Sequence, residues 1–172
     1  TVPYALFREQ EDAQGYLQLF ERIIVRKGIP LAVYTDRHSI FVNSAKESLE
    51  EQLAGKRKPT QFGRAMMELG IENIFALSPE AKGRIERLWQ TFQDRLVVEL
   101  RLAGAATIDD ANRVLWEYLP KFNARFGVPA REEGLAYRKP DAKLPLEGTL
   151  CFKYERIVAR DNTIRFDNHV IQ

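Results

Sequence analysis

The stretch IENIFALSPEAKGRIERLWQTFQDRL, residues 71–96, changes its pattern at a Ser-Pro turn. Its first part, residues 71–77, is a short apolar run that predicts a strand. Beyond the turn, apolar residues recur at intervals of three and four, which places them on one face of a helix. They are Ile85, Leu88, Trp89, Phe92 and Leu96. Ser78 suits the N-cap and Pro79 the first helical position, so the stretch predicts a strand followed directly by an amphipathic helix.

Strands and helices also alternate upstream of this stretch. The predicted elements are a strand at 2–7, a helix at about 11–26, a strand at 31–35, a polar helix at 43–55 with a Ser44–Glu47 capping box, and a short helix at 62–69. Gly28 and Pro30 mark the end of the first helix. The run LAVYT (31–35) is typical of strands buried in parallel sheets. This alternation indicates an α/β domain.

The pattern changes downstream. A further helix is predicted from Thr107 to Phe126, and Pro120 should bend or split it. Residues 131–148 are rich in proline, glycine and charge, which is typical of a linker. Two strands are then predicted, at 149–158 and 163–166, about a turn at Asp161 and Asn162. We therefore divide the chain into a core (1–130), a linker (131–148) and the start of a small β-rich domain (149–172).

The bulk composition is that of a globular protein with a modest positive charge. Among 172 residues, 45% are hydrophobic and 29% are charged, and the net charge is +2. That balance excludes a disordered chain and is compatible with a nucleic-acid partner without demanding one. The one cysteine, Cys151, cannot form an internal disulfide or a thiolate zinc cluster. No apolar run approaches the ~20 residues of a membrane span. We expect a cytoplasmic protein, and, because the chain begins at Thr1 without Met, a piece of a longer one.

Two acids stand where an α/β domain binds ligands. Asp36 follows the strand at 31–35, and Glu86 lies in the first turns of the helix after the next strand. Both can therefore point at the crevice beyond the carboxyl ends of the strands. Paired carboxylates there suit hard divalent cations that also bind phosphate and water. The ordinary alternative is that Asp36 is a turn residue and Glu86 belongs to a solvated helix face with weak ion pairs.

Cations crowd around these acids. The expected DNA contacts are Lys82, Arg84 and Arg87 on the helix and Lys56, Arg57 and Lys58 in the turn GKRKPT (55–60), here called the basic turn. Gly83 would let a DNA backbone pass close to the helix. The alternative for the basic turn is a solvated loop. His38 is expected to organise a turn, and Trp89 and Trp116 are expected in the core because they lie on apolar faces.

Three segments, in this order, resemble the catalytic cores of DDE transposases and retroviral-type integrases. YTDRHSIF (34–41) is similar to the segment with the second catalytic aspartate. MELGIENIFALSPEAKGRIERLWQTFQDRL (67–96) resembles the third-acid segment, in which a Gly-x-x-Glu-Arg helix start carries the catalytic glutamate, here Glu86. YLPKFNARFGVPA (118–130) is similar to the closing helix. The resemblance covers residues 1–130, is nearest to bacterial insertion-sequence transposases of the ISNCY kind, and implies a ribonuclease-H-like α/β fold.

The resemblance also implies a function for the whole enzyme. Asp36, Glu86 and one further Asp would hold two Mg²⁺ or Mn²⁺ ions for metal-dependent cleavage and transfer of DNA strands. The family's first Asp has no counterpart here. We therefore expect a core that lacks its first strands, and we expect this chain alone to be catalytically inactive. The interval between Asp36 and Glu86 is longer than the family's commonest one, which marks residues 43–60 as an insertion.

The expected partners are transposon-end DNA, target DNA and further copies of the chain. No membrane partner is expected, and the expected location is the bacterial nucleoid. The alternatives are a nuclease of the same fold and, for this chain alone, a non-catalytic DNA-binding or assembly module. In this fold the missing strands lie between the strands at 2–7 and 31–35. We therefore expect one of two outcomes: the strand at 2–7 pairs with the strand at 31–35, or a second copy of the chain completes the sheet. We favour the second outcome.

Overall fold

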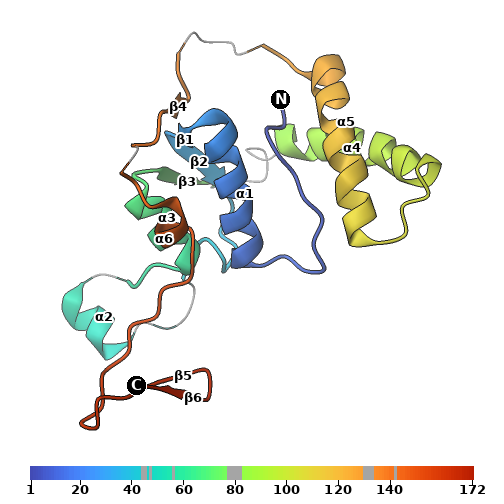
Figure 1. The fold of residues 1–172 in the computed structure, drawn as a ribbon. Helices are drawn as coiled ribbons and strands as arrows, with labels where there is room; N and C mark the ends of the chain where they lie inside the picture. The colour runs from blue at the N-terminus through green and yellow to red at the C-terminus, as the bar shows by residue number, and fades with distance from the viewer. Residues whose placement is uncertain (44–45, 47, 56, 77–82, 130–133, 142) are drawn as a thin grey trace.

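The computed structural model describes residues 1–43, 46, 48–55, 57–76, 83–129, 134–141 and 143–172, without the side chains of Glu50 and Arg84. Figure 1 shows a mixed α/β chain, as predicted. The helices are α1 (Ala13–Lys27), α2 (Leu49–Ala54), α3 (Gln61–Glu68), α4 (Gly83–Leu102), α5 (Ile108–Phe126) and α6 (Leu146–Thr149). The strands are β1 (Ile29–Pro30), β2 (Ala32–Thr35), β3 (Glu72–Phe75), β4 (Tyr137–Arg138), β5 (Ile164–Phe166) and β6 (His169–Ile171). None of the described helices is long and apolar enough to cross a membrane.

A parallel strand pair lies at the centre of the first half of the chain. β2 pairs with β3 in register from Ala32 opposite Glu72 to Thr35 opposite Phe75. The connection between them contains α3, so β2 and β3 form the strand–helix–strand unit that the alternation predicts. Among the described residues, β2 pairs with β3 alone, while β1 pairs with β4 and β5 with β6. The predicted strands at 31–35 and 71–77 are therefore confirmed.

Two separate hydrophobic cores hold the chain together. The first core packs α1 against α3 around Phe62, which is fully buried, and it includes Leu17, Phe20, Ile24, Ile29, Phe41, Ala65, Met66, Leu69 and Ile71. The second core packs α4 against α5, through Phe92, Leu96, Leu115, Tyr118, Leu119 and Phe122. Residues 1–12, here called the N-terminal strap, add Ala5 to the second core and then lead into α1.

The helix ends follow their capping signals. Asp12 caps α1 by accepting the backbone N–H of Gly15 at 2.7 Å, and Gly28 ends the helix with a positive φ of 97°. Thr107 caps α5 in a reciprocal capping box with Asp110. α5 continues through Pro120, so the predicted split is wrong. Proline removes a single intrahelical bond, and buried residues on both sides of it, Tyr118, Leu119 and Phe122, pack against the second core.

The predicted strand at 2–7 is wrong, because this segment pairs with side chains of α5 instead of with a strand. Asn123 accepts the backbone N–H of Val2 at 2.7 Å and donates to its carbonyl at 2.8 Å. Asn112 does the same for Phe7, at 2.7 and 3.1 Å. Two asparagine amides thus supply the donors and acceptors of a neighbouring strand. The collapse of residues 2–7 onto β2 is therefore also wrong.

The C-terminal part departs from prediction in a similar way. Residues 149–158 do not form a strand, because α3 side chains bind their backbone: Gln61 exchanges two hydrogen bonds with Lys153, and Arg64 donates to Thr149. β5, predicted within 163–166, pairs with β6 across a turn at Asp167 and Asn168 instead. Within the predicted linker, β4 pairs with β1 and α6 packs beside the first core.

Three further predictions need correction. α2 begins at Leu49 with Ser48 as its cap; the predicted capping residues Ser44 and Glu47 lie outside the described residues. β2 is half exposed, because the first core covers only the face that carries Val33. The opposite face is open, with Tyr34 50% exposed. The tryptophans are not core residues: Trp89 is 49% and Trp116 43% exposed.

Candidate functional site

The two predicted acids lie at the carboxyl edge of the β2–β3 pair and at the helix that follows it. Because β2 and β3 are parallel, both strands end at the same edge. Asp36 follows β2 directly, and Glu86 lies in the first turn of α4. Loops diverge at such an edge, which makes it a common place for ligands in open α/β sheets. Both acids stand on the expected elements, and their role as metal ligands stays a prediction.

Asp36 organises the turn that leaves β2. It is half-buried, and its Oδ1 accepts the backbone N–H of His38 at 3.0 Å. The Nδ1 of His38 accepts the N–H of Ile40 at 3.4 Å, so this imidazole is turned back onto its own loop, as predicted. A carboxylate has two oxygens and about four lone-pair sites. A turn bond and a cation are therefore compatible on the same carboxylate.

Glu86 is exposed on the first turn of α4, where the helix dipole favours a negative charge. Arg87 beside it is also exposed, and its Nε donates to the carbonyl of Gly83 at 3.1 Å. Among the described residues, no atom lies within 4 Å of the position that a Cβ at Gly83 would occupy. Lys82, Ser78 and Pro79, and the side chain of Arg84, lie outside the described residues.

The basic turn is tied to α2 and to Asn43, which precedes that helix. Arg57 donates to the backbone carbonyl of Asn43 at 2.6 Å, and the backbone N–H of Lys58 donates to Glu51 at 2.8 Å. Hydrogen bonds from the backbone N–H groups of Ser48 and Lys58 lower the pKa of the Glu51 carboxyl. Arg57 and Lys58 are exposed, whereas Lys56 lies outside the described residues. The turn is thus held in place with two cations at the surface.

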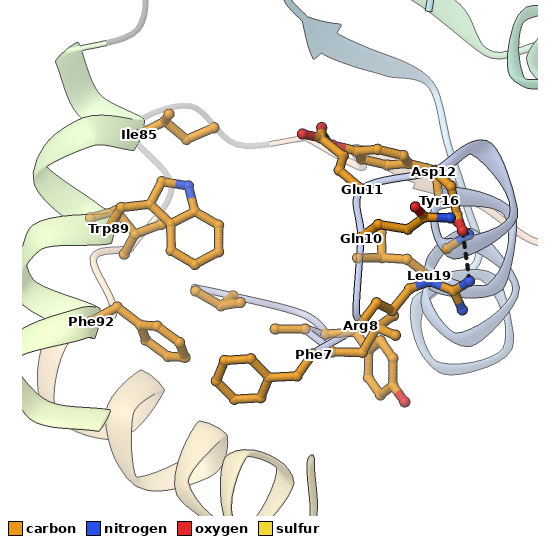
Figure 2. Close-up of a pocket in the computed structure, with 16 residues that line it drawn as sticks. Phe7, Arg8, Gln10, Glu11, Asp12, Tyr16, Leu19, Ile85, Trp89 and Phe92 are labelled. Carbon is orange, nitrogen blue, oxygen red and sulfur yellow. Dashed lines mark hydrogen bonds and ion pairs between the residues drawn. The ribbon is translucent and has the colours of Figure 1, made fainter. Parts of the chain in front are cut away.

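A cleft of about 460 Å³ lies between α4 and the N-terminal strap with α1 (Figure 2). Ile85, Trp89 and Phe92 project from α4 on one side, and Phe7, Glu11 and Tyr16 lie across from them. Ile85 is the neighbour of Glu86 in the sequence, so the start of α4 borders this cleft.

Glu11 and Tyr16 are polar residues of the cleft that sequence reasoning missed. The Tyr16 hydroxyl donates to Oε1 of Glu11 at 2.5 Å. Burial raises the pKa of Tyr16 well above its ordinary value, and the hydrogen bond to Glu11 and the charges of Glu11 and Asp36 raise it further. The charge of Asp36 therefore acts on a hydroxyl that lines the cleft. No sequence signal pointed to this contact, because the strap was expected to be a strand.

The described residues contain no group of three or more His, Cys, Asp or Glu side chains that could hold a metal ion. Among the described residues, Asp36 and Glu86 are thus not joined by a third acid into a group that could hold a metal ion. The expectation that the family's first Asp has no counterpart in the chain stays a prediction.

Comparison with known proteins identifies relatives along the chain. It is 37% identical over 166 residues to the putative transposase y4bF of Sinorhizobium fredii, and the aligned region covers 96% of this chain and 35% of that protein. It is 36% identical over 166 residues to the transposase for insertion sequence IS1202 of Streptococcus pneumoniae, and that aligned region covers 95% of this chain and 34% of that protein. The chain therefore spans about a third of the length of these relatives. No family profile matches the chain, and no solved structure does.

Proposed function

We propose that this chain, which belongs to the insertion-sequence transposases, is part of the catalytic core of a DDE-type DNA transposase with a ribonuclease-H-like fold. The observation that carries the proposal is the parallel pairing of β2 and β3. It brings Asp36 and the strand that leads to α4 to one edge, where the active sites of open α/β sheets form. The names of the two relatives support transposition over a nuclease of the same fold.

The donor chemistry of the proposed site fits Mg²⁺ or Mn²⁺. Asp36 and Glu86 offer carboxylate oxygens, the ligands that hard divalent cations prefer. In the complete enzyme, we propose that a third acid from outside these 172 residues joins them and that two ions bind. Such ions supply charge stabilisation at a phosphodiester and lower the pKa of bound water. This chain's own contribution is to hold two of the acids on a strand end and a helix start.

Positive charge beside the acids would hold the DNA. Arg87 is exposed one residue from Glu86 and keeps its guanidinium near the start of α4 through its bond to Gly83. We propose phosphate contacts by Arg87, Lys82 and Arg84, and by the basic turn. Phosphate contacts position DNA without reading its sequence, so these residues would serve transposon ends and target DNA alike.

For this chain alone, a non-catalytic DNA-binding or assembly module is the second candidate. The expectation that the family's first catalytic Asp has no counterpart in this chain is the reason for this candidate. In-line displacement needs both the attacking and the leaving oxygen stabilised, which two carboxylates and one weakly held ion do not achieve. We therefore propose that the isolated chain binds DNA and that the longer protein cleaves and joins it.

A strand-transfer assay tests the proposal. The longer protein containing this chain is incubated with Mg²⁺ and the ends of its own element, and joined products are resolved on a gel. Asp36→Asn and Glu86→Gln should each abolish joining. The matched controls are Asp94→Asn, an exposed acid further along α4, and Glu72→Gln, at the opposite end of β3. Joining by the Glu86→Gln variant, or Mg²⁺-dependent nicking by the isolated chain, would contradict the assignment.

A further inference from the structure

The C-terminal hairpin (β5 and β6) and the segment before it together form a cluster of two aromatic rings and one arginine, here called the C-terminal platform. The rings of Tyr154 and Phe166 lie 5.3 Å apart between centroids. The guanidinium of Arg156 lies over both of them, 5.5 Å from the first ring and 5.2 Å from the second. The three side chains also line a groove of about 450 Å³. That volume is within the ~300–1,000 Å³ of pockets that hold small ligands.

The platform is open to solvent on one face of the hairpin. In the β5–β6 register, Ile164 lies opposite Ile171 and Phe166 opposite His169, so these side chains share a face. Arg165 and Val170, the pair between them, lie on the other face. Tyr154 is 53% and Phe166 37% exposed. Part of each ring is therefore accessible to a partner in solution.

The charge of the platform suits an anionic partner. Among the described residues, no carboxylate forms a salt bridge with Arg156, whose guanidinium donates to the backbone carbonyl of Glu155 at 2.9 Å. Asp161, the acid of the neighbouring turn, bonds to Thr163 within that turn at 2.7 Å. The guanidinium of Arg156 thus places a positive charge, without a salt-bridge partner among the described residues, beside two rings whose planes are tilted by 47° to each other.

The segment that carries Tyr154 and Arg156 is also anchored, at the residue before Tyr154. Lys153, the residue before Tyr154, exchanges two backbone hydrogen bonds with Gln61 and forms a salt bridge with Glu68 at 2.8 Å. Gln61 and Glu68 are the first and last residues of α3, which is part of the first core. The end of the platform at Tyr154 therefore lies next to a residue held on α3, beside the first core.

We propose that the C-terminal platform binds single-stranded DNA by stacking unpaired bases on the exposed parts of Tyr154 and Phe166, with the positive charge of Arg156 beside them. This proposal rests on the proposed function, since it takes DNA as the partner. Every base has a flat face that stacks on aromatic rings and guanidinium planes, whereas in a duplex that face is covered by neighbouring bases. The guanidinium would meet the adjacent phosphate. The platform is distinct from the contacts proposed for duplex DNA near Glu86 and the basic turn.

The test compares a labelled thymine oligonucleotide with a duplex of the same length by fluorescence anisotropy on the purified chain. Tyr154→Leu and Phe166→Leu keep apolar bulk but remove the ring, and each should weaken single-strand binding at least about fivefold, the lower end of what one stacked base contributes. Tyr154→Phe should bind like the wild type, because it keeps the ring. Arg156→Gln should weaken binding more than Arg165→Gln, the matched cation on the opposite face.

The outcomes separate the two proposals. Circular dichroism and a Val170→Ala variant, on the opposite face of the hairpin, control for unfolding of β5 and β6. Unchanged single-strand affinity in folded Tyr154→Leu and Phe166→Leu variants, with duplex binding intact, overturns the platform alone. Equal losses of single-strand affinity in Arg156→Gln and Arg165→Gln also overturn it, because net charge alone would then explain the effect. Absence of binding to either DNA contradicts the proposed function itself.

Discussion

Replacing Asn112 by alanine tests how the N-terminal strap is held. The Asn112 side chain is buried, and it accepts the backbone N–H of Phe7 at 2.7 Å and donates to the carbonyl of Phe7 at 3.1 Å. Asn112→Ala leaves this donor and this acceptor without their partner. An unsatisfied buried group costs about 1–3 kcal/mol. Because Phe7 is only half-buried and water can reach part of it, we expect a loss near the lower end for each group, about 2–3 kcal/mol in total.

That loss is large against the ~5–15 kcal/mol by which domains are stable. Urea unfolding followed by tryptophan fluorescence measures it, because Trp116 stacks on Tyr4 of the strap at 5.9 Å. Hydrogen exchange at the Phe7 amide should accelerate in the same variant. The matched control is Glu117→Ala, an exposed residue of α5, which should change the stability by less than ~0.5 kcal/mol. A change as small for Asn112→Ala, with unaltered exchange at Phe7, would refute the account of the strap.

Three further outcomes are expected. Replacing the three cations of the basic turn with glutamine should lower the salt dependence of duplex binding, by ~0.9 in the log–log slope for each DNA phosphate that the turn neutralises; an unchanged slope would make the turn a solvated loop. Because β2 has no described partner on its second edge, analytical ultracentrifugation should detect dimers, and a monomer at high concentration would argue against strand pairing between copies. Hydrogen bonds from Thr107 lower the pKa of Asp110, so its contribution to stability is present at neutral pH and is lost as the pH falls below the ordinary value of 3.8. Thermal unfolding of Asp110→Ala should accordingly occur at a lower temperature than that of the wild type at neutral pH, with the difference shrinking in acid; a difference independent of pH would contradict this.

The helices and the parallel strand pair could be predicted because their signals are local. Thr107 caps the start of α5 and Gly28 caps the end of α1, each directly beside its helix. The runs at 31–35 and 71–77 are bounded by turn residues. The placement of Asp36 and Glu86 on their elements followed from these boundaries. Local patterns decide the helix ends because capping hydrogen bonds join residues a few positions apart. The runs predicted β2 and β3 as strands, whereas their pairing joins distant residues, from Ala32 with Glu72 to Thr35 with Phe75.

The strap could not be predicted, because its partners are distant in the sequence. Val2 and Phe7 lie in a short apolar run typical of a strand, but the groups that satisfy their backbone belong to Asn123 and Asn112, more than a hundred residues away. The contact of Tyr16 with Glu11 depends on the course of this strap, so it was missed with it. The β5–β6 hairpin was accessible from the sequence: Asp167 and Asn168 are residues that tolerate the positive φ of a two-residue hairpin turn.

Paramagnetic broadening by Mn²⁺ tests most directly whether Asp36 and Glu86 serve one cation. In amide spectra of the isolated chain titrated with Mn²⁺, signals of Arg37 and His38 after β2 and of Ile85 and Arg87 in α4 should broaden together. Either Asp36→Asn or Glu86→Gln should raise the Mn²⁺ concentration needed to broaden both groups, whereas Asp94→Asn should leave it unchanged. Broadening of one group without the other, or equal broadening in all the variants, would contradict a shared site.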